Sequence, residues 1–154
     1  MTLDSSALVA ILFSEPGYLE LVDRILEADS VRVGAPTLVE TGMVVAGRKG
    51  GKAGREVEDL VRELAVTIVP FGEAEWQAAT AAYTRYGRGR HKAALNFGDC
   101  LAYATAAVAA DGQRGQLGQA LAGDRVHGAR AELVDRVLLT AHHRDDQLET
   151  VLLR

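Results

Sequence analysis

The sequence predicts an α/β fold with a central parallel sheet whose two faces are both covered by helices. Two observations predict it. Short apolar segments typical of strands alternate with segments whose apolar residues recur every three or four positions, as on one face of a helix. The chain has 154 residues, 48% of them hydrophobic, which suits one soluble domain with a real core. This alternation of strand and helix favours a three-layer α/β/α arrangement.

The N-terminal part predicts two strands, each followed by helix. The strands are expected at residues 1–4 and 31–35. The helices are expected at 7–13 with Ser5 and Ser6 at the N-cap, at 18–28 after the Pro16-Gly17 break, and from Pro36 to about Gly47.

The middle of the chain continues the alternation. Residues 54–64 form the clearest amphipathic helix, and the β-branched run 66–69 suits a buried strand. A helix over 73–86 follows, with an inner stripe of Trp76, Ala79, Tyr83 and Tyr86. A basic, glycine-rich loop at 87–97 then leads to an alanine-rich helix at 99–110.

The composition changes after residue 110. The stretch 111–123 contains four glycines and three glutamines and no good strand, although another strand is expected at this point of the pattern. Residues 131–139 are compatible with either helix or strand. We therefore divide the chain into a domain at 1–124 and an atypical C-terminal extension at 125–154.

Charge and cysteine content indicate the compartment. The net charge is −4, no apolar run approaches the roughly 20 residues that span a bilayer, and Met1 is not followed by a basic leader. The single cysteine, Cys100, excludes an internal disulfide and a thiolate zinc site. We expect a cytoplasmic protein without a membrane segment.

Three acidic residues occur in apolar surroundings. Asp4 ends the first strand, Glu40 lies inside an apolar helical run, and Asp99 opens the alanine-rich helix. Ordinary roles remain open for each of them: a helix cap for Asp4, a helix-dipole partner for Asp99 and a solvated edge for Glu40.

The alternative is a metal site. No lysine or arginine lies within four residues of any of the three acids, and a buried carboxylate must be neutralised, paired or bound to a cation. The carboxyl ends of parallel strands form the crevice in which Asp4 is expected, and the following helices can direct Glu40 and Asp99 into it. Clustered oxygen ligands without Cys or His favour Mg²⁺ or Mn²⁺.

Two basic groups suggest an anionic substrate such as a phosphodiester. One contains Arg85, Arg88, Arg90 and Lys92 with His91, Tyr83 and Tyr86, in a region between Trp76 and Gly98 that has no acid; the other contains Arg48, Lys49, Lys52 and Arg55. Ordinary solvated loops are the alternative interpretation of both groups.

Three segments together resemble the signature motifs of PIN-domain ribonucleases, specifically the VapC toxins of bacterial toxin–antitoxin pairs. They are Asp4-Ser5-Ser6-Ala7-Leu8, Pro36-Thr37-Leu38-Val39-Glu40, and Asn96-Phe97-Gly98-Asp99 with the residues that follow to Ala104; the loop 86–91 also fits. The resemblance is collinear from residue 1 to about 110. It implies a PIN-like α/β/α sandwich, Mg²⁺-dependent cleavage of RNA, inhibition by a cognate VapB antitoxin, and a homodimer.

The resemblance also assigns roles to residues. It implies that Asp4 and Asp99 are metal ligands and that Glu40 completes the catalytic set, with Ser6 as a small hydroxyl residue beside the first acid. Glu40 would orient or deprotonate the attacking water or bind a second ion. Arg88, Arg90 or Lys92 would hold the RNA backbone.

The resemblance weakens after the third motif. VapC toxins have a short strand there and a Gly-Asp pair that carries a fourth acid; Asp124 in Gly123-Asp124-Arg125 is the candidate, but the connection before it is unusually long and rich in glycine. Residues 137–154 instead resemble a segment of tRNA(Ile)-lysidine synthetases, without that family's Ser-Gly-Gly-x-Asp-Ser loop for ATP. Taken alone, His142, His143, Asp145 and Asp146 suit either a metal cluster or a solvated turn.

Two other functions compete with a ribonuclease. A catalytically impaired PIN-like module that binds antitoxin or RNA without cleaving is the alternative if the altered C-terminal part spoils the site. A haloacid-dehalogenase-type phosphatase also begins with an Asp at a strand end, but it needs a second Asp two residues later, where this chain has Ser6.

Overall fold

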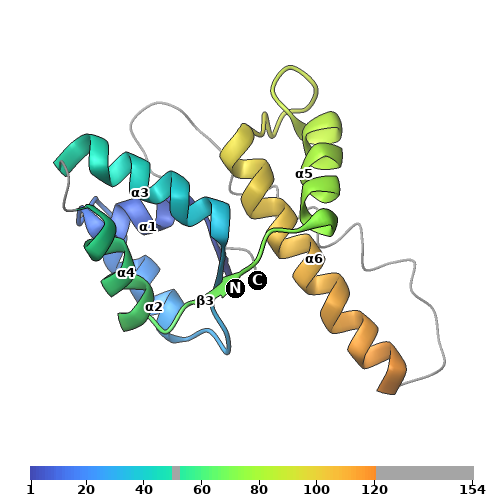
Figure 1. The fold of residues 1–154 in the computed structure, drawn as a ribbon, viewed down its shortest axis with the longest axis horizontal. Coiled ribbons are helices and arrows are strands. Elements are labelled where there is room, and N and C mark those ends of the chain that lie inside the picture. The colour runs from blue at the N-terminus through green and yellow to red at the C-terminus, as the bar shows by residue number, and fades with distance from the viewer. Residues whose placement is uncertain (50–52, 121–154) are drawn as a thin grey trace.

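The computed structural model describes residues 1–49 and 53–120. Its elements alternate as expected (Figure 1). In chain order they are β1 (Thr2–Leu3), α1 (Ser5–Leu12), α2 (Tyr18–Leu26), β2 (Arg32–Gly34), α3 (Ala35–Lys49), α4 (Ala53–Glu63), β3 (Thr67–Val69), α5 (Glu73–Tyr86) and α6 (Phe97–Ala120).

The described strands form one parallel sheet in the order β1-β2-β3. Leu3 pairs with Val33, and Val33 pairs with Ile68. Helices lie on both sides of the sheet: α1, α2 and α4 on one, and α6 with α5 on the other (Figure 1). The three-layer α/β/α prediction is confirmed.

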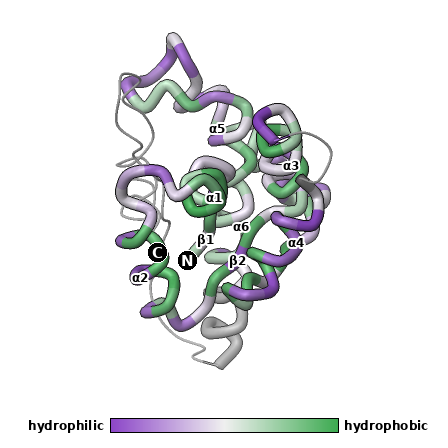
Figure 2. Tube along the Cα trace, turned by 90° about the vertical axis from the view of Figure 1, so that its left-hand side faces the viewer, coloured by the Kyte–Doolittle hydropathy of each residue, from purple (hydrophilic) through white to green (hydrophobic). Residues whose placement is uncertain are grey.

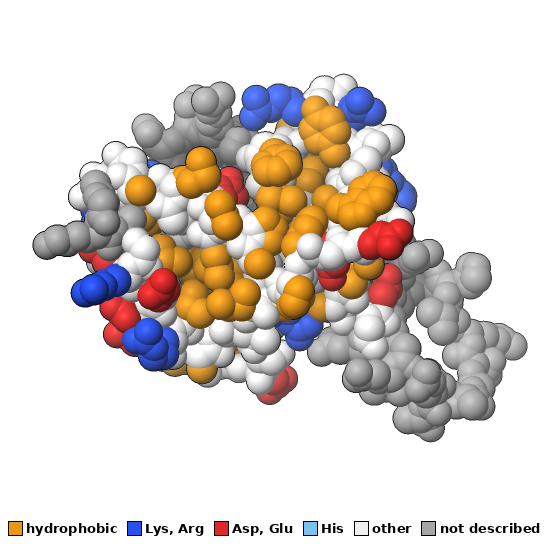
Figure 3. Space-filling view, in the orientation of Figure 1, with side chains coloured by type: hydrophobic (Ala, Val, Ile, Leu, Met, Phe, Trp, Pro, Cys, Tyr) orange, Lys and Arg blue, Asp and Glu red, His pale blue; other side chains and the backbone are white. Residues whose placement is uncertain are grey.

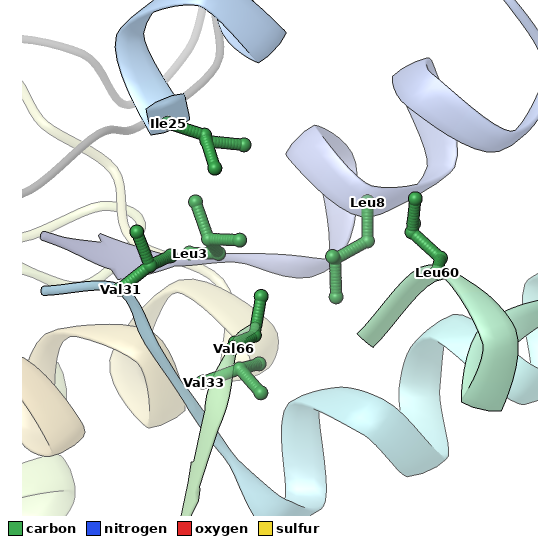
Figure 4. Packing of buried hydrophobic residues seen from close by; sticks show 7 residues of the cluster. All are labelled: Leu3, Leu8, Ile25, Val31, Val33, Leu60 and Val66. Atoms are coloured by element: carbon green, nitrogen blue, oxygen red, sulfur yellow. The ribbon is translucent and has the colours of Figure 1, made fainter. Parts of the chain in front are cut away.

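The main core fills the space between the sheet and the first helical layer. Figure 4 shows its buried residues side by side, contributed by strands and by α1, α2 and α4. They are Leu3, Leu8, Ile25, Val31, Val33, Leu60 and Val66. The helix α1 is apolar over most of its length (Figure 2), and its residues Ala7 to Ala10 are buried. The core therefore fixes the end of β1 and the start of α1.

The helix α6 approaches the opposite face of the sheet very closely. A Cβ atom at Gly34 would lie only 2.5 Å from Thr105 Oγ1. Thr105 is buried and its hydroxyl donates to the carbonyl of Leu101, 3.0 Å away. Since side chains alternate between the faces of a strand, Val33 faces the main core while position 34 faces α6. Glycine at 34 thus brings the N-terminal half of α6 next to β2.

Several predicted boundaries are wrong in detail. The N-cap of α1 is Asp4 rather than Ser5 or Ser6, because the Asp4 carboxylate accepts the hydrogen bond from the Ala7 N–H. The helix α6, predicted at 99–110, begins at Phe97 and continues to Ala120, through much of the glycine- and glutamine-rich stretch.

Two predictions of burial hold only in part. In the run 66–69, Val66 is buried in the main core, but Ile68 is 51% exposed because β3 lies at the edge of the described sheet. In α5 the expected inner residues Trp76 and Tyr83 are 53% and 45% exposed, whereas Tyr86 is buried. This helix packs on α6 through Ala79, Ala82 and Tyr86, so half of the predicted stripe stays outside.

Three expectations cannot be compared with the fold. The candidate fourth acid Asp124, the extension 125–154 and the basic residue Lys52 all lie outside the described residues. Across residues 1–49 and 53–120, none of the helices combines the length and the apolar character needed to cross a membrane.

Candidate active site

Asp4 lies at the carboxyl end of β1, directly before the first turn of α1. Its Oδ1 accepts a hydrogen bond from the Ala7 N–H at 2.8 Å, and the Ser6 hydroxyl donates to both carboxylate oxygens at 3.0 Å. The residue is 7% exposed. The helix-cap role left open by the sequence is therefore real, and the same contacts hold the carboxylate in one orientation.

Burial also changes the acidity of Asp4. Its pKa is raised to about 6, chiefly because desolvation penalises the charged form. The bonds from Ala7 and Ser6 act in the opposite direction, and the negative charges of Asp99 and Glu40 add to the increase. The three acids that lie far apart in the sequence are thus close enough for their charges to interact.

Glu40 comes from the second turn of α3, which follows β2 without a loop. Its side chain is partly buried, and its Oε2 is buried without a hydrogen-bond partner among residues 1–49 and 53–120. The carboxylate lies against the first turn of α6, where a Cβ atom at Gly98 would come within 2.6 Å of both oxygens. This oxygen is buried and has no donor among the described residues, so the expectation of a solvated edge does not describe it.

Asp99 is held by a reciprocal pair of hydrogen bonds with Asn96. Asn96 Oδ1 accepts from the Asp99 N–H at 3.0 Å, and Asp99 Oδ2 accepts from the Asn96 N–H at 2.8 Å. This is a capping box, in which two otherwise unpaired N–H groups of the helix start are satisfied. The expected helix-start role is correct, and one carboxylate oxygen, Oδ1, is not used by it.

The chemistry of the three acids and their surroundings suits the binding of a hard cation. Among the described residues, no Lys or Arg forms an ion pair with Asp4, Glu40 or Asp99. The donors are all carboxylate oxygens, the type that Mg²⁺ and Mn²⁺ prefer. The unpartnered Glu40 Oε2 and the raised pKa of Asp4 are both features that a cation would relieve.

The acids are neighbours, but they do not form a closed cage. In the described part of the chain, no three His, Cys, Asp or Glu side chains converge tightly enough to hold a metal ion. A cation at this edge of the sheet would thus need these carboxylates to move toward one another, or further ligands.

The two basic groups differ in their surroundings. Arg48 pairs with Glu15, and Lys49 pairs with Glu56 at 2.8 Å, with both cations also over the Phe13 ring. Arg48 and Lys49 are thus paired surface residues, whereas Arg55 is exposed and forms no ion pair among the described residues.

The basic group at the end of α5 and in the following loop is not neutralised by acidic residues in the described part of the chain. Arg85, Arg88, Arg90 and Lys92 are exposed, and none of them forms an ion pair among the described residues. The loop that carries most of them closes on itself, because the Arg88 N–H donates to the Leu95 carbonyl at 3.2 Å. Since Leu95 directly precedes the Asn96 cap of α6, this basic loop ends beside the acids; blue side chains at the top of Figure 3 mark its face.

Two site residues were not singled out by the sequence. Asn96 and Gly98 belong to the third motif, but the sequence assigns no role to either of them. The Asn-x-x-Asp spacing is a recognisable capping pattern that could have identified Asn96. A glycine within a helix is a weaker signal, since only the tertiary contact with Glu40 gives it a purpose.

Comparison with known proteins agrees with this arrangement. Residues 1–112 match the PIN domain family. Ribonuclease VapC of Mycolicibacterium smegmatis is 42% identical over 109 residues, which are 70% of this chain and 84% of that protein. Ribonuclease VapC30 of Mycobacterium tuberculosis is 40% identical over 109 residues, 70% of this chain and 82% of that protein. Ribonuclease VapC36 of the same species is 41% identical over 107 residues, 69% of this chain and 77% of that protein. The chain therefore belongs to the PIN-domain family, in the group that includes these VapC proteins.

Proposed function

We propose that the chain is a Mg²⁺-dependent endoribonuclease and the toxin of a VapBC-type toxin–antitoxin pair. The observation that supports this most is the set of three carboxylates, Asp4, Glu40 and Asp99, that lie within electrostatic reach of one another with no paired cation among the described residues. Relatives of this chain carry the name ribonuclease.

Asp4 and Asp99 are the residues that would bind Mg²⁺, with Mn²⁺ as a substitute. Each already has one carboxylate oxygen fixed by backbone N–H donors, so little side-chain freedom remains to be lost on binding. When bound, the cation lowers the pKa of a water ligand and stabilises negative charge on the phosphate.

Glu40 would act on the attacking water. Its Oε2 has no donor, so it is available to accept a hydrogen bond from that water and to orient or deprotonate it. Binding a second cation is the other role that this oxygen allows. Asp124 is the candidate for a fourth acid.

Arg88, Arg90 and Lys92 would bind the phosphates of the RNA backbone. They are exposed and carry no counter-charge among the described residues, so contact with RNA would not require breaking an existing ion pair. The Arg90 guanidinium lies 5.5 Å from the centre of the exposed Tyr83 ring, a pairing common where bases stack.

The expected protein partners are a cognate VapB antitoxin and a second copy of this chain. Figure 3 shows apolar side chains gathered on one face of the molecule. The exposed apolar residues of the described elements α3, α5 and the start of α6 include Val39, Met43, Trp76 and Phe97. We propose this face for the homodimer, in a cytoplasmic protein whose nuclease domain is 1–124 and whose extension is 125–154.

The test is cleavage of single-stranded RNA by the purified protein. We expect cleavage with Mg²⁺, none after chelation by EDTA, and restoration by added Mg²⁺ or Mn²⁺. The variants Asp4→Asn and Asp99→Asn should lose activity, whereas Asp29→Asn, at an exposed position, should keep it. Equal cleavage by all four proteins would contradict the proposed site.

A binding module without catalysis is the second candidate. It is favoured by the lack, within the described residues, of three acids that converge on a cation-sized space. No RNA cleavage under any metal condition, together with tight binding of a VapB-type partner, would select it.

A further inference from the structure

We propose that Gly98 is a positioning residue for Glu40. The lack of a side chain at position 98 lets the Glu40 carboxylate lie against the first turn of α6, beside Asp99. This inference rests on the proposed ribonuclease function, because Glu40 belongs to that site.

The space at position 98 is occupied by Glu40 itself. A Cβ atom there would lie 2.5 Å from Glu40 Oε1, 2.6 Å from Oε2 and 2.9 Å from Cδ. All three distances are shorter than real contacts of a Cβ atom, so any larger residue at 98 would exclude the carboxylate from its present position.

The backbone gives no other reason for glycine at this position. Gly98 lies in the first turn of α6, and its φ is not among the positive values of the described residues. Glycine is less favourable than alanine within a helix, so its presence weakens the start of α6. What it provides is the room that the Glu40 carboxylate fills.

The same helix offers a matched control. Gly112 also lies within α6, but a Cβ atom built there has no neighbour within 4 Å in the described part of the chain. Alanine at 112 changes helix propensity alone, whereas alanine at 98 changes helix propensity and the position of Glu40.

The effect of Gly98→Ala follows from the flexibility of its neighbour. The added methyl group meets the far end of a glutamate side chain rather than backbone atoms. That side chain can rotate away, so the domain should stay folded while its carboxylate leaves Asp99. A displacement of about 1 Å in a catalytic group is enough to reduce a rate by about a hundred-fold.

The first experiment compares RNA cleavage by the native protein, Gly98→Ala and Gly112→Ala at saturating Mg²⁺. We expect Gly98→Ala to lower kcat by about a hundred-fold with little change in KM, and Gly112→Ala to leave both constants unchanged. Native kcat in Gly98→Ala would overturn the proposal and leave the proposed ribonuclease function intact.

A rescue separates positioning from a general structural effect. Glu40→Asp shortens the side chain by one methylene group and withdraws the carboxylate from position 98. In that background, Gly98→Ala should lower kcat far less than in the native background. An equal loss in both backgrounds would contradict the assigned role.

A third measurement does not depend on activity. In metal-free protein, Gly98→Ala should raise the melting temperature more in a Glu40→Ala background than in the native background, because the methyl group then meets no carboxylate. If the native protein does not cleave RNA, the ribonuclease proposal fails, and this comparison still decides the contact. An equal shift in melting temperature in both backgrounds would overturn the proposed contact between position 98 and Glu40.

Discussion

Asn96 and Asp99 fix each other at the start of α6: the side-chain oxygen of each accepts the backbone N–H of the other, at 3.0 and 2.8 Å. One carboxylate oxygen of Asp99 is thereby tied to the protein and the other is left for a ligand. The candidate metal ligand Asp99 is therefore also part of the capping box at the start of α6.

Loss of this cap should affect both stability and activity. Asn96→Ala removes the acceptor for the Asp99 N–H and should reduce the free energy of unfolding by about 1 kcal/mol. That corresponds to a fall in melting temperature of about 2–4 °C for a domain of this size. Asn96→Ser retains a capping oxygen and is the control. Thermal unfolding and RNA cleavage should both be close to native in Asn96→Ser; equal losses in the two variants would show that the cap is not the cause.

The buried charge of Asp4 should make stability depend on pH. Its pKa is about 6 in the folded protein against 3.8 for an ordinary carboxyl group, so the folded chain keeps the proton while the unfolded chain loses it. The contribution of Asp4 to stability is therefore greatest below pH 3.8 and falls as the pH rises to about 6, by about 3 kcal/mol.

Asp4→Asn tests this dependence without removing the cap, since asparagine caps helices as well as aspartate does. In metal-free protein at pH 7, the variant should melt at a higher temperature than the native protein, and the difference should shrink as the pH falls toward 4. Added Mg²⁺ should stabilise the native protein more than Asp4→Asn. If the difference in melting temperature between the native protein and Asp4→Asn is the same at pH 4 and pH 7, the raised pKa of Asp4 is contradicted.

The basic loop should govern RNA affinity rather than the chemical step. Replacing Arg88, Arg90 and Lys92 with glutamine should raise KM for single-stranded RNA and leave kcat nearly unchanged. Each lost phosphate contact should also reduce the slope of log K against log[salt] by about 0.7. Arg55→Gln, an exposed arginine on α4, is the matched control. An unchanged salt dependence in the triple variant would show that RNA binds elsewhere.

Gly34 should be needed for packing rather than for chemistry. Gly34→Ala places a methyl group 2.5 Å from Thr105 Oγ1, and overpacking of this kind costs about 1–3 kcal/mol. The combined variant Gly34→Ala with Thr105→Ala removes the opposing hydroxyl and should recover part of the lost stability. Denaturant unfolding of the native protein, the two single variants and the double variant measures the coupling between positions 34 and 105. Strictly additive changes in the free energy of unfolding would contradict a direct contact.

The layers of the fold were predictable because they depend on local patterns. Alternating strand and helix segments, and the amphipathic helix that became α4, gave the correct architecture. Burial was less predictable, because it depends on neighbours that are remote in the sequence. Ile68 is exposed since β3 is an edge of the described sheet, and Trp76 is exposed since α5 packs on α6 through the face that carries Ala82 and Tyr86.

The candidate site shows the same division. The sequence by itself determined which acids stand out, since Asp4, Glu40 and Asp99 occur in apolar segments without a nearby cation. It did not determine that Glu40 Oε2 lacks a donor among the described residues, or that Gly98 leaves room for that carboxylate. Those facts were decided by the tertiary structure, because they depend on how closely α6 approaches α3 and β2, and the spacing of residues along the chain carries no information about distances between packed elements.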